Sequence, residues 1–164
     1  MSQPHLMNFD LYLQQLGYPQ APAPTLETLR ELQWRHVCRF AFESLSTLLR
    51  VPVPIDLASV ERKILHEGRG GYCYELNQAF LVLLQHLGFD ARGITGRVVM
   101  GAPEDALTAR SHRLALVHLE GQRYIVDVGF GGMVPTAPLL LDTEQEQATP
   151  HEPCLLYTSP SPRD

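Results

Sequence analysis

The chain has 164 residues, of which 45% are hydrophobic, enough apolar material for the packed core of one ordinary domain or two small ones. It carries 13 Lys and Arg residues against 18 Asp and Glu residues, which gives a net charge of −5. No basic cluster stands out in the sequence. Because nucleic-acid binding requires a basic surface, we expect no nucleic-acid partner.

The first nine residues lack the basic start and the apolar run of a signal peptide. No stretch approaches the roughly 20 apolar residues that a membrane span needs. The three cysteines show no metal-ligand spacing and fit a reducing compartment better than a disulfide framework. We therefore predict a cytoplasmic protein without membrane contact and without a metal. Nothing in the sequence specifies an oligomeric state.

Four amphipathic helices are predicted in the first half of the chain. Apolar residues recur at helical spacing in each, and a glycine follows at or just after each of three ends. Polar capping residues precede the first three. The predicted spans are 9–16 after Asn8, 26–38 after Thr25, 57–67 after Asp56 and 73–87 after a pair of glycines.

The pattern changes to strand-like runs after residue 91. Residues 92–100, 111–119 and 123–128 are rich in β-branched and aliphatic side chains. Residues 101–110 are polar and contain proline, which suits an exposed loop. Helices followed by strands predict an α+β fold.

Cys73 is a candidate nucleophile because it lies in the first turn of the fourth predicted helix. The unpaired backbone N–H groups and the positive dipole end of a helix start favour a thiolate over a thiol. Arg69 adds positive charge nearby, and Gly70 and Gly71 permit close approach of a ligand. The alternative is a small buried hydrophobe on an amphipathic helix, the commoner role of a lone cysteine.

A catalytic thiolate needs a histidine and a third group that orients this histidine. If Glu120 and Gly121 form a two-residue hairpin loop, His112 and Asp127 lie on one face of the hairpin as diagonal neighbours. Diagonal positions are roughly 7 to 8 Å apart, which His and Asp side chains can span. A three-residue loop would shift the register and separate them.

Asp127 lies between two valines, where an unpaired carboxylate is costly, so His112 is its predicted partner. Taken alone, Asp127 is better interpreted as a hydrogen-bonded structural carboxylate, and His112 as a satisfied or exposed strand-end residue. Their shared face, together with Cys73 at a helix start, favours a catalytic interpretation. The other histidines lack such a context and are interpreted as surface or packing residues.

Two segments carry a family resemblance: Arg69-Gly-Gly-Tyr-Cys-Tyr-Glu-Leu-Asn77 and, after His112, Val126-Asp-Val-Gly-Phe-Gly131. In this order they strongly resemble the arylamine N-acetyltransferases, over about residues 9–141. The resemblance implies a helical bundle over residues 1–90 that carries the cysteine and an incomplete antiparallel β-barrel over residues 91–153 that carries the histidine and the aspartate. It also implies a cysteine-protease-like Cys–His–Asp arrangement and a third, α/β lid domain that this chain lacks.

The resemblance further implies a two-step acetyl transfer. The thiolate of Cys73, paired with protonated His112, would take the acetyl group from acetyl-CoA. An arylamine, an arylhydrazine or an N-hydroxyarylamine would then take it from the cysteine. The implied site residues are Phe42, Tyr72 and Phe130 around the amine, and Arg69, Gly129 and Gly131 toward the cofactor.

Two other interpretations remain open. A thiol hydrolase or a transglutaminase-like protein uses the same three residue types for acyl transfer. An inactive truncated fragment is the second, because an incomplete barrel leaves an unpaired sheet edge. Residues 154–164 resemble one translated reading frame of a transposase adapter used in sequencing libraries and are predicted to be non-native, whereas a native Ser/Pro-rich tail is the alternative.

Overall fold

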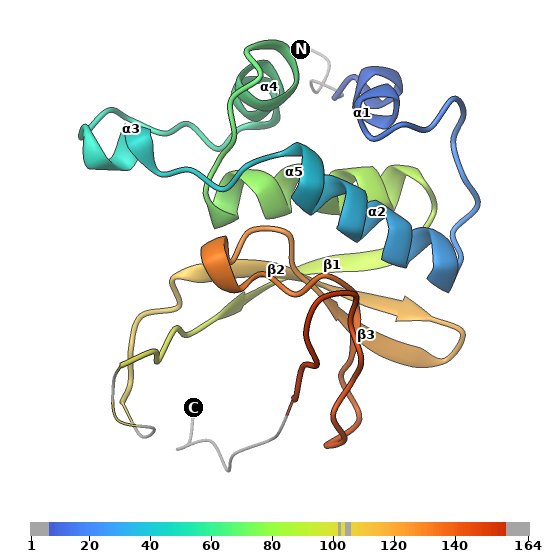
Figure 1. Cartoon of the computed structure of the whole chain (residues 1–164). Helices are drawn as coiled ribbons and strands as arrows, with labels where there is room; N and C mark the ends of the chain where they lie inside the picture. Colours follow the sequence, from blue (N-terminus) through green and yellow to red (C-terminus); the bar gives the residue numbers. More distant parts are fainter. Residues whose placement is uncertain (1–6, 102, 104–105, 157–164) are drawn as a thin grey trace, which may run out of the picture.

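A layer of helices covers one face of an antiparallel sheet in the computed structural model, which describes residues 7–101, 103 and 106–156 (Figure 1). The helices are α1 (Phe9–Gln15), α2 (Leu26–Arg39), α3 (Leu45–Leu48), α4 (Leu57–Glu61) with its π-helical continuation η1 (Arg62–His66), α5 (Cys73–His86) and the short 3-10 turn η2 (Gly131–Met133). The strands are β1 (Asp90–Gly96), β2 (His112–Leu119), β3 (Gln122–Val126) and β4 (Leu139–Leu140).

The four predicted helices are confirmed, and three of them begin at the predicted caps. Asn8, Thr25 and Asp56 each accept a hydrogen bond from a backbone N–H three residues later, over 3.0 to 3.2 Å. These bonds satisfy N–H groups that the first turn of a helix leaves without partners. Helix α3 was not predicted, since it has four residues, no capping bond and no buried side chain.

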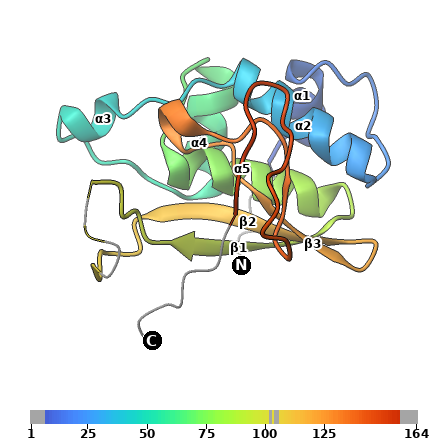
Figure 2. The same ribbon diagram turned by 60° about the horizontal axis from the view of Figure 1, so that its bottom comes forward.

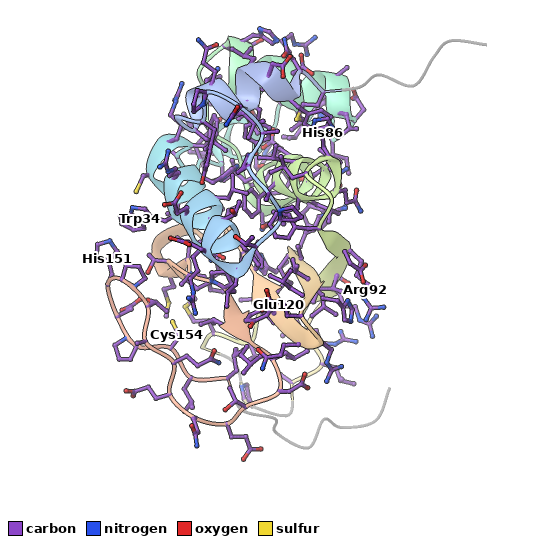
Figure 3. All side chains as sticks on the ribbon, turned by 90° about the vertical axis from the view of Figure 1, so that its right-hand side faces the viewer. Trp34, His86, Arg92, Glu120, His151 and Cys154 are labelled. Carbon is purple, nitrogen blue, oxygen red and sulfur yellow. The ribbon has the colours of Figure 1, made fainter. Side chains whose placement is uncertain are left out.

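The four strands form an antiparallel sheet in the order β1-β2-β3-β4. The predicted two-residue turn is confirmed: Glu120 and Gly121 have φ angles of 52° and 76°, as a type I′ turn requires. Figure 3 labels Glu120 at this turn. The register is also as predicted, with Leu119 opposite Gln122.

Two predicted strands need correction, and one strand was missed. Strand β1 ends at Gly96, because this residue already pairs with His112 at the start of β2 and no strand among the described residues pairs with residues 97–100. Strand β3 ends at Val126, because the N–H of Val128 bonds to the side chain of Asn77 on α5 instead of to a strand. Strand β4, only two residues long, was not predicted.

The described strands, which were expected to form an incomplete barrel, form an open antiparallel sheet. Strand β4 pairs with β3 alone, so β1 and β4 are the two edges of an open sheet. Helix α5 lies directly on this sheet and contacts β1 and β2. The buried core between them includes Leu76, Phe80, Leu83 and Leu84 from the helix, and Ala115, Val117 and Val126 from the strands. Through this packing, the start of α5 lies beside the start of β2.

The segment after β4 returns to the helical layer. The ring of His151 lies 4.7 Å from that of Trp34 on α2 (Figure 3). Cys154, within the tail that we predict to be non-native, pairs through its backbone with Gln147, and the rest of that tail from residue 157 lies outside the described residues. Among the helices described, none combines the length and the apolar character that crossing a bilayer takes.

Candidate active site

Cys73 is the first residue of α5, and its side chain is buried. Two glycines before it let the chain pack tightly against residues 41–43. A Cβ atom at Gly70 would lie 1.8 Å from the carbonyl oxygen of Ala41, so only glycine fits there. The N–H of Gly71 donates to this same oxygen over 3.1 Å. The glycine pair thus fixes where α5 begins, and with it the position of the thiol.

His112 and Asp127 form the contact that the hairpin register predicts. Nε2 of His112 lies 2.5 Å from Oδ2 of Asp127, and both side chains are buried. The other carboxylate oxygen accepts hydrogen bonds from Nδ2 of Asn77 over 2.9 Å and from the N–H of Gly129 over 2.8 Å. One oxygen therefore faces the imidazole while the other is held by two donors.

The imidazole of His112 also interacts with the thiol of Cys73, since each of the two groups shifts the pKa of the other. Because Nε2 faces Asp127, Nδ1 is the nitrogen available to the sulfur. The sulfur also lies 3.7 Å from the carbonyl oxygen of Ser111, which precedes β2. The three side chains thus lie in the order thiol, imidazole and carboxylate.

The electrostatics of the three groups favour an ion pair between sulfur and imidazole. Burial alone would lower the pKa of His112, but the hydrogen bonds and charges of Asp127 and Cys73 raise it from 6.5 to about 9. Burial alone would raise the pKa of the Cys73 thiol, but its bonds to His112 and to backbone N–H groups bring this pKa below its usual value. A lowered thiol pKa beside a raised imidazole pKa is the arrangement of an activated thiol nucleophile.

Asn77 and Gly129 support the site in ways that sequence reasoning missed. The side chain of Asn77 bonds to Asp127, to the N–H of Val128 over 3.0 Å and to the carbonyl of Arg113 over 2.6 Å. Its position one helical turn after Cys73 was the available signal. At Gly129, expected near the cofactor, a Cβ atom would lie 2.9 Å from the Cα of Cys73. Gly129 therefore lets the chain after β3 pack against the start of α5.

The expected amine-pocket aromatics gather partly around His112. The ring of Phe130 meets the imidazole edge to face, with 4.8 Å between the ring centres. Phe42 lies beside Gly131: a Cβ atom added to this glycine would lie 3.5 Å from the ring. The side chain of Phe42 is 45% exposed. Tyr72 immediately precedes Cys73, and its ring packs against Tyr74.

Arg69 lies in an ion-pair network that sequence reasoning did not anticipate. Its guanidinium group is 2.7 Å from a carboxylate oxygen of Glu43 and also donates to Ser46. Lys63 pairs with the same glutamate over 3.2 Å and with the buried Glu75 over 2.7 Å. The charge of Arg69 is therefore balanced by Glu43. No group of three His, Cys, Asp or Glu side chains that could hold a metal is found within the described part of the chain.

Comparisons with known proteins identify relatives of this chain. A family model described as N-acetyltransferase matches residues 25–161. The chain is 45% identical over 141 residues to the arylamine N-acetyltransferase / N-hydroxyarylamine O-acetyltransferase of Salmonella typhimurium, covering 86% of this chain and 48% of that protein. It is 44% identical over 140 residues to the arylamine N-acetyltransferase of Escherichia coli, and the match covers 85% of this chain and 50% of that protein.

The fold agrees with solved structures as well. The Salmonella typhimurium enzyme superposes with a TM-score of 0.85 at 42% identity, over 91% of this chain and 54% of that one. The Mycobacterium marinum arylamine N-acetyltransferase in complex with CoA gives a TM-score of 0.85 at 41% identity, and the match covers 93% of this chain and 58% of that one. The chain spans about half the length of the curated relatives it matches. By sequence and by fold, it belongs to the arylamine N-acetyltransferase family.

Proposed function

We propose that this chain transfers an acetyl group from acetyl-CoA to the nitrogen of arylamines, arylhydrazines or N-hydroxyarylamines through an acetyl-Cys73 intermediate. The observation that carries the proposal is the buried imidazole of His112, which hydrogen-bonds to Asp127 and interacts electrostatically with Cys73. The names of the relatives and the CoA complex of the Mycobacterium marinum enzyme support the choice of donor and acceptor.

In the first step the thiolate of Cys73 attacks the carbonyl carbon of the thioester. Backbone N–H groups at the start of α5, which a helix leaves unpaired, would donate to the oxygen on which negative charge develops. The carbon–sulfur bond to CoA then breaks, and His112 gives its proton to the departing thiolate. The products are acetyl-Cys73, free CoA and a neutral imidazole.

In the second step the amine nitrogen attacks the acetyl carbon. Neutral His112 accepts the proton that the nitrogen loses, and the bond between the carbon and the cysteine sulfur breaks. This restores the thiolate–imidazolium pair. Asp127 holds the ring orientation throughout and stabilises the imidazolium, as the third member of such a triad does.

Aromatic side chains supply the proposed acceptor pocket. The proposed ring surfaces are those of Phe130, in contact with His112, and of Phe42, beside Gly131. Tyr72 completes the set through its place before Cys73. For the coenzyme, Gly131 offers backbone without a side chain, in a left-handed conformation with a φ of 68° that favours glycine. Arg69 and Gly129 are proposed to lie near the coenzyme without bonding to it. The guanidinium group of Arg69 already pairs with Glu43, and the N–H of Gly129 already donates to Asp127.

Acetylation of the protein tests the proposal directly. The chain is incubated with acetyl-CoA, and the modified residue is identified by intact and peptide mass. We expect one acetyl group on Cys73, none in Cys73→Ser, and an unchanged yield in Cys38→Ser, which removes an exposed cysteine away from the site. An acetylated Cys73→Ser protein would overturn the assignment.

Release of CoA distinguishes transfer from hydrolysis. Transfer predicts one equivalent of CoA from acetyl-CoA alone and continued release only when an arylamine is added. Continued release without an amine would show that water is the acceptor and that the chain is a thiol hydrolase.

A further inference from the structure

Gln33 joins α2 to the segment that follows β3, at two points. Its side chain is fully buried on α2. Nε2 donates one hydrogen bond to the carbonyl oxygen of Asp127 over 3.2 Å and another to that of Pro135 over 2.7 Å. A single amide nitrogen, with its two hydrogens, therefore holds two carbonyl groups that are eight residues apart in the chain.

The segment between these two carbonyls, residues 127–135, carries the proposed acceptor surface. It contains Phe130, whose ring meets His112, and Gly131, which lies beside Phe42. Figure 2 shows this segment, in orange after β3, against the helical layer. Because Gln33 holds both ends of the segment, it limits how far the ring of Phe130 can move relative to His112.

The carboxylate of Asp127 does not depend on Gln33. Asn77 and the N–H of Gly129 hold one of its oxygens, and His112 holds the other. Gln33 contacts only the backbone of this residue. Loss of the Gln33 amide is therefore expected to loosen the loop that carries Phe130 more than it disturbs the triad.

We propose that Gln33 is a positioning residue for the aromatic acceptor: it fixes the loop of residues 127–135 so that Phe130 forms one wall of the pocket beside Cys73. The inference rests on the proposed function for the identity of the acceptor. It concerns recognition of an aromatic ring near the thiol and can be measured without acetyl transfer.

Two alkylating reagents that differ only in a phenyl ring provide the measurement. Chloroacetamide and 2-chloro-N-phenylacetamide react alike: the thiolate sulfur attacks the methylene carbon, a carbon–sulfur bond forms, and chloride leaves. The ratio of their rate constants at Cys73, followed by peptide mass, reports how well the site receives the ring. The same ratio at the exposed Cys38 is an internal reference, since this residue lies outside the site.

In Gln33→Met, which keeps the side-chain volume but donates no hydrogen bond, we expect the phenyl preference at Cys73 to fall about fivefold, the effect of one well-placed aromatic contact. The ratio at Cys38 should stay constant. Gln85→Met is the matched control, because it removes an amide bond to the carbonyl of Ala91 from the far end of α5. An unchanged ratio in Gln33→Met, or an equal fall in Gln85→Met, would overturn the inference.

A double variant tests whether Gln33 acts through Phe130. Phe130→Leu alone should lower the preference to a similar extent, and adding Gln33→Met should lower it little further; additive losses would contradict the proposed route. If Gln33→Met does not melt cooperatively, the same rate ratio is measured in Gln33→Asn, whose side chain carries the same amide but is shorter by one methylene. If the inference about Gln33 is wrong, Cys73 is still acetylated by acetyl-CoA. If the proposed function is wrong, the phenyl preference of the two alkylating reagents can still be measured.

Discussion

Replacing Asp127 by Asn tests whether the carboxylate activates the thiol. The change keeps the size of the side chain and leaves an oxygen that can still accept from Asn77 and Gly129. Its NH2 group would then face Nε2 of His112, which favours a neutral imidazole whose proton is on Nδ1. The thiolate of Cys73 would lose its charged partner.

The size of the effect follows from the pKa of His112. Its rise from 6.5 to about 9 corresponds to about 3 kcal/mol in favour of the imidazolium. Asp127 supplies the leading part of that rise, while burial opposes it. Without the carboxylate the imidazole is mostly neutral at pH 7, and burial raises the pKa of the Cys73 thiol. An ordinary cysteine thiol is only about 3% thiolate at pH 7. We therefore expect alkylation of Cys73 at pH 7 to slow by at least about 30-fold.

Chloroacetamide alkylation of Cys73, measured from pH 5 to pH 9 by peptide mass, reads this change. The midpoint of the rate profile should move to higher pH in Asp127→Asn. Asp142→Asn is the control, since Asp142 pairs with Arg123 on the surface. Wild-type rates at pH 7 in the Asp127→Asn protein, with an unmoved midpoint, would refute the role given to the carboxylate.

Two further predictions concern stability. Gly129→Ala should lower the free energy of unfolding by about 1 to 3 kcal/mol, because its Cβ atom would lie 2.9 Å from the Cα of Cys73; Gly132→Ala, with no atom within 4 Å, is the control, and equal urea midpoints would contradict the packing argument. In Cys73→Ser, Asp127 still raises the folded-state pKa of His112, but less than in the wild-type protein, whose pKa of about 9 includes a contribution from the thiol. The ion pair of His112 and Asp127 should therefore stabilise the fold fully below pH 6.5 and lose this effect before the pH reaches about 9. Urea unfolding at pH 6.5 and at pH 9 measures this loss of stability. The control is the Cys73→Ser protein that also carries His112→Gln. An equal change in stability with pH in the two proteins would count against the prediction.

The elements that the sequence predicted well depend on neighbouring residues. The caps Asn8, Thr25 and Asp56 bond to N–H groups three residues away, so the starts of their helices can be located from a short window. The pairing of β2 with β3 follows from Glu120 and Gly121, because a two-residue turn fixes the register. From this local information alone, His112 and Asp127 were expected to meet.

The features that the sequence did not predict depend on segments far apart in the chain. Val128 continues the apolar pattern of β3, yet its N–H bonds to Asn77 on α5, which is why the strand ends earlier than its composition indicates. The bonds of Gln33 span more than ninety residues. Such contacts arise only when α2 and α5 pack against the sheet, and no periodicity in the sequence encodes them. For the π-helical turn of η1 we have no physical account.

The division of the site between two layers has a consequence for folding. His112 and Asp127 come from one hairpin and can meet as soon as that hairpin forms, whereas Cys73 joins them only when α5 settles on the sheet. Before that moment its sulfur is an ordinary thiol, mostly protonated at neutral pH. In an immature or misfolded copy of the chain, Cys73 is therefore poorly reactive. The rate at which Cys73 is alkylated during folding then reports when the helical layer and the sheet come together.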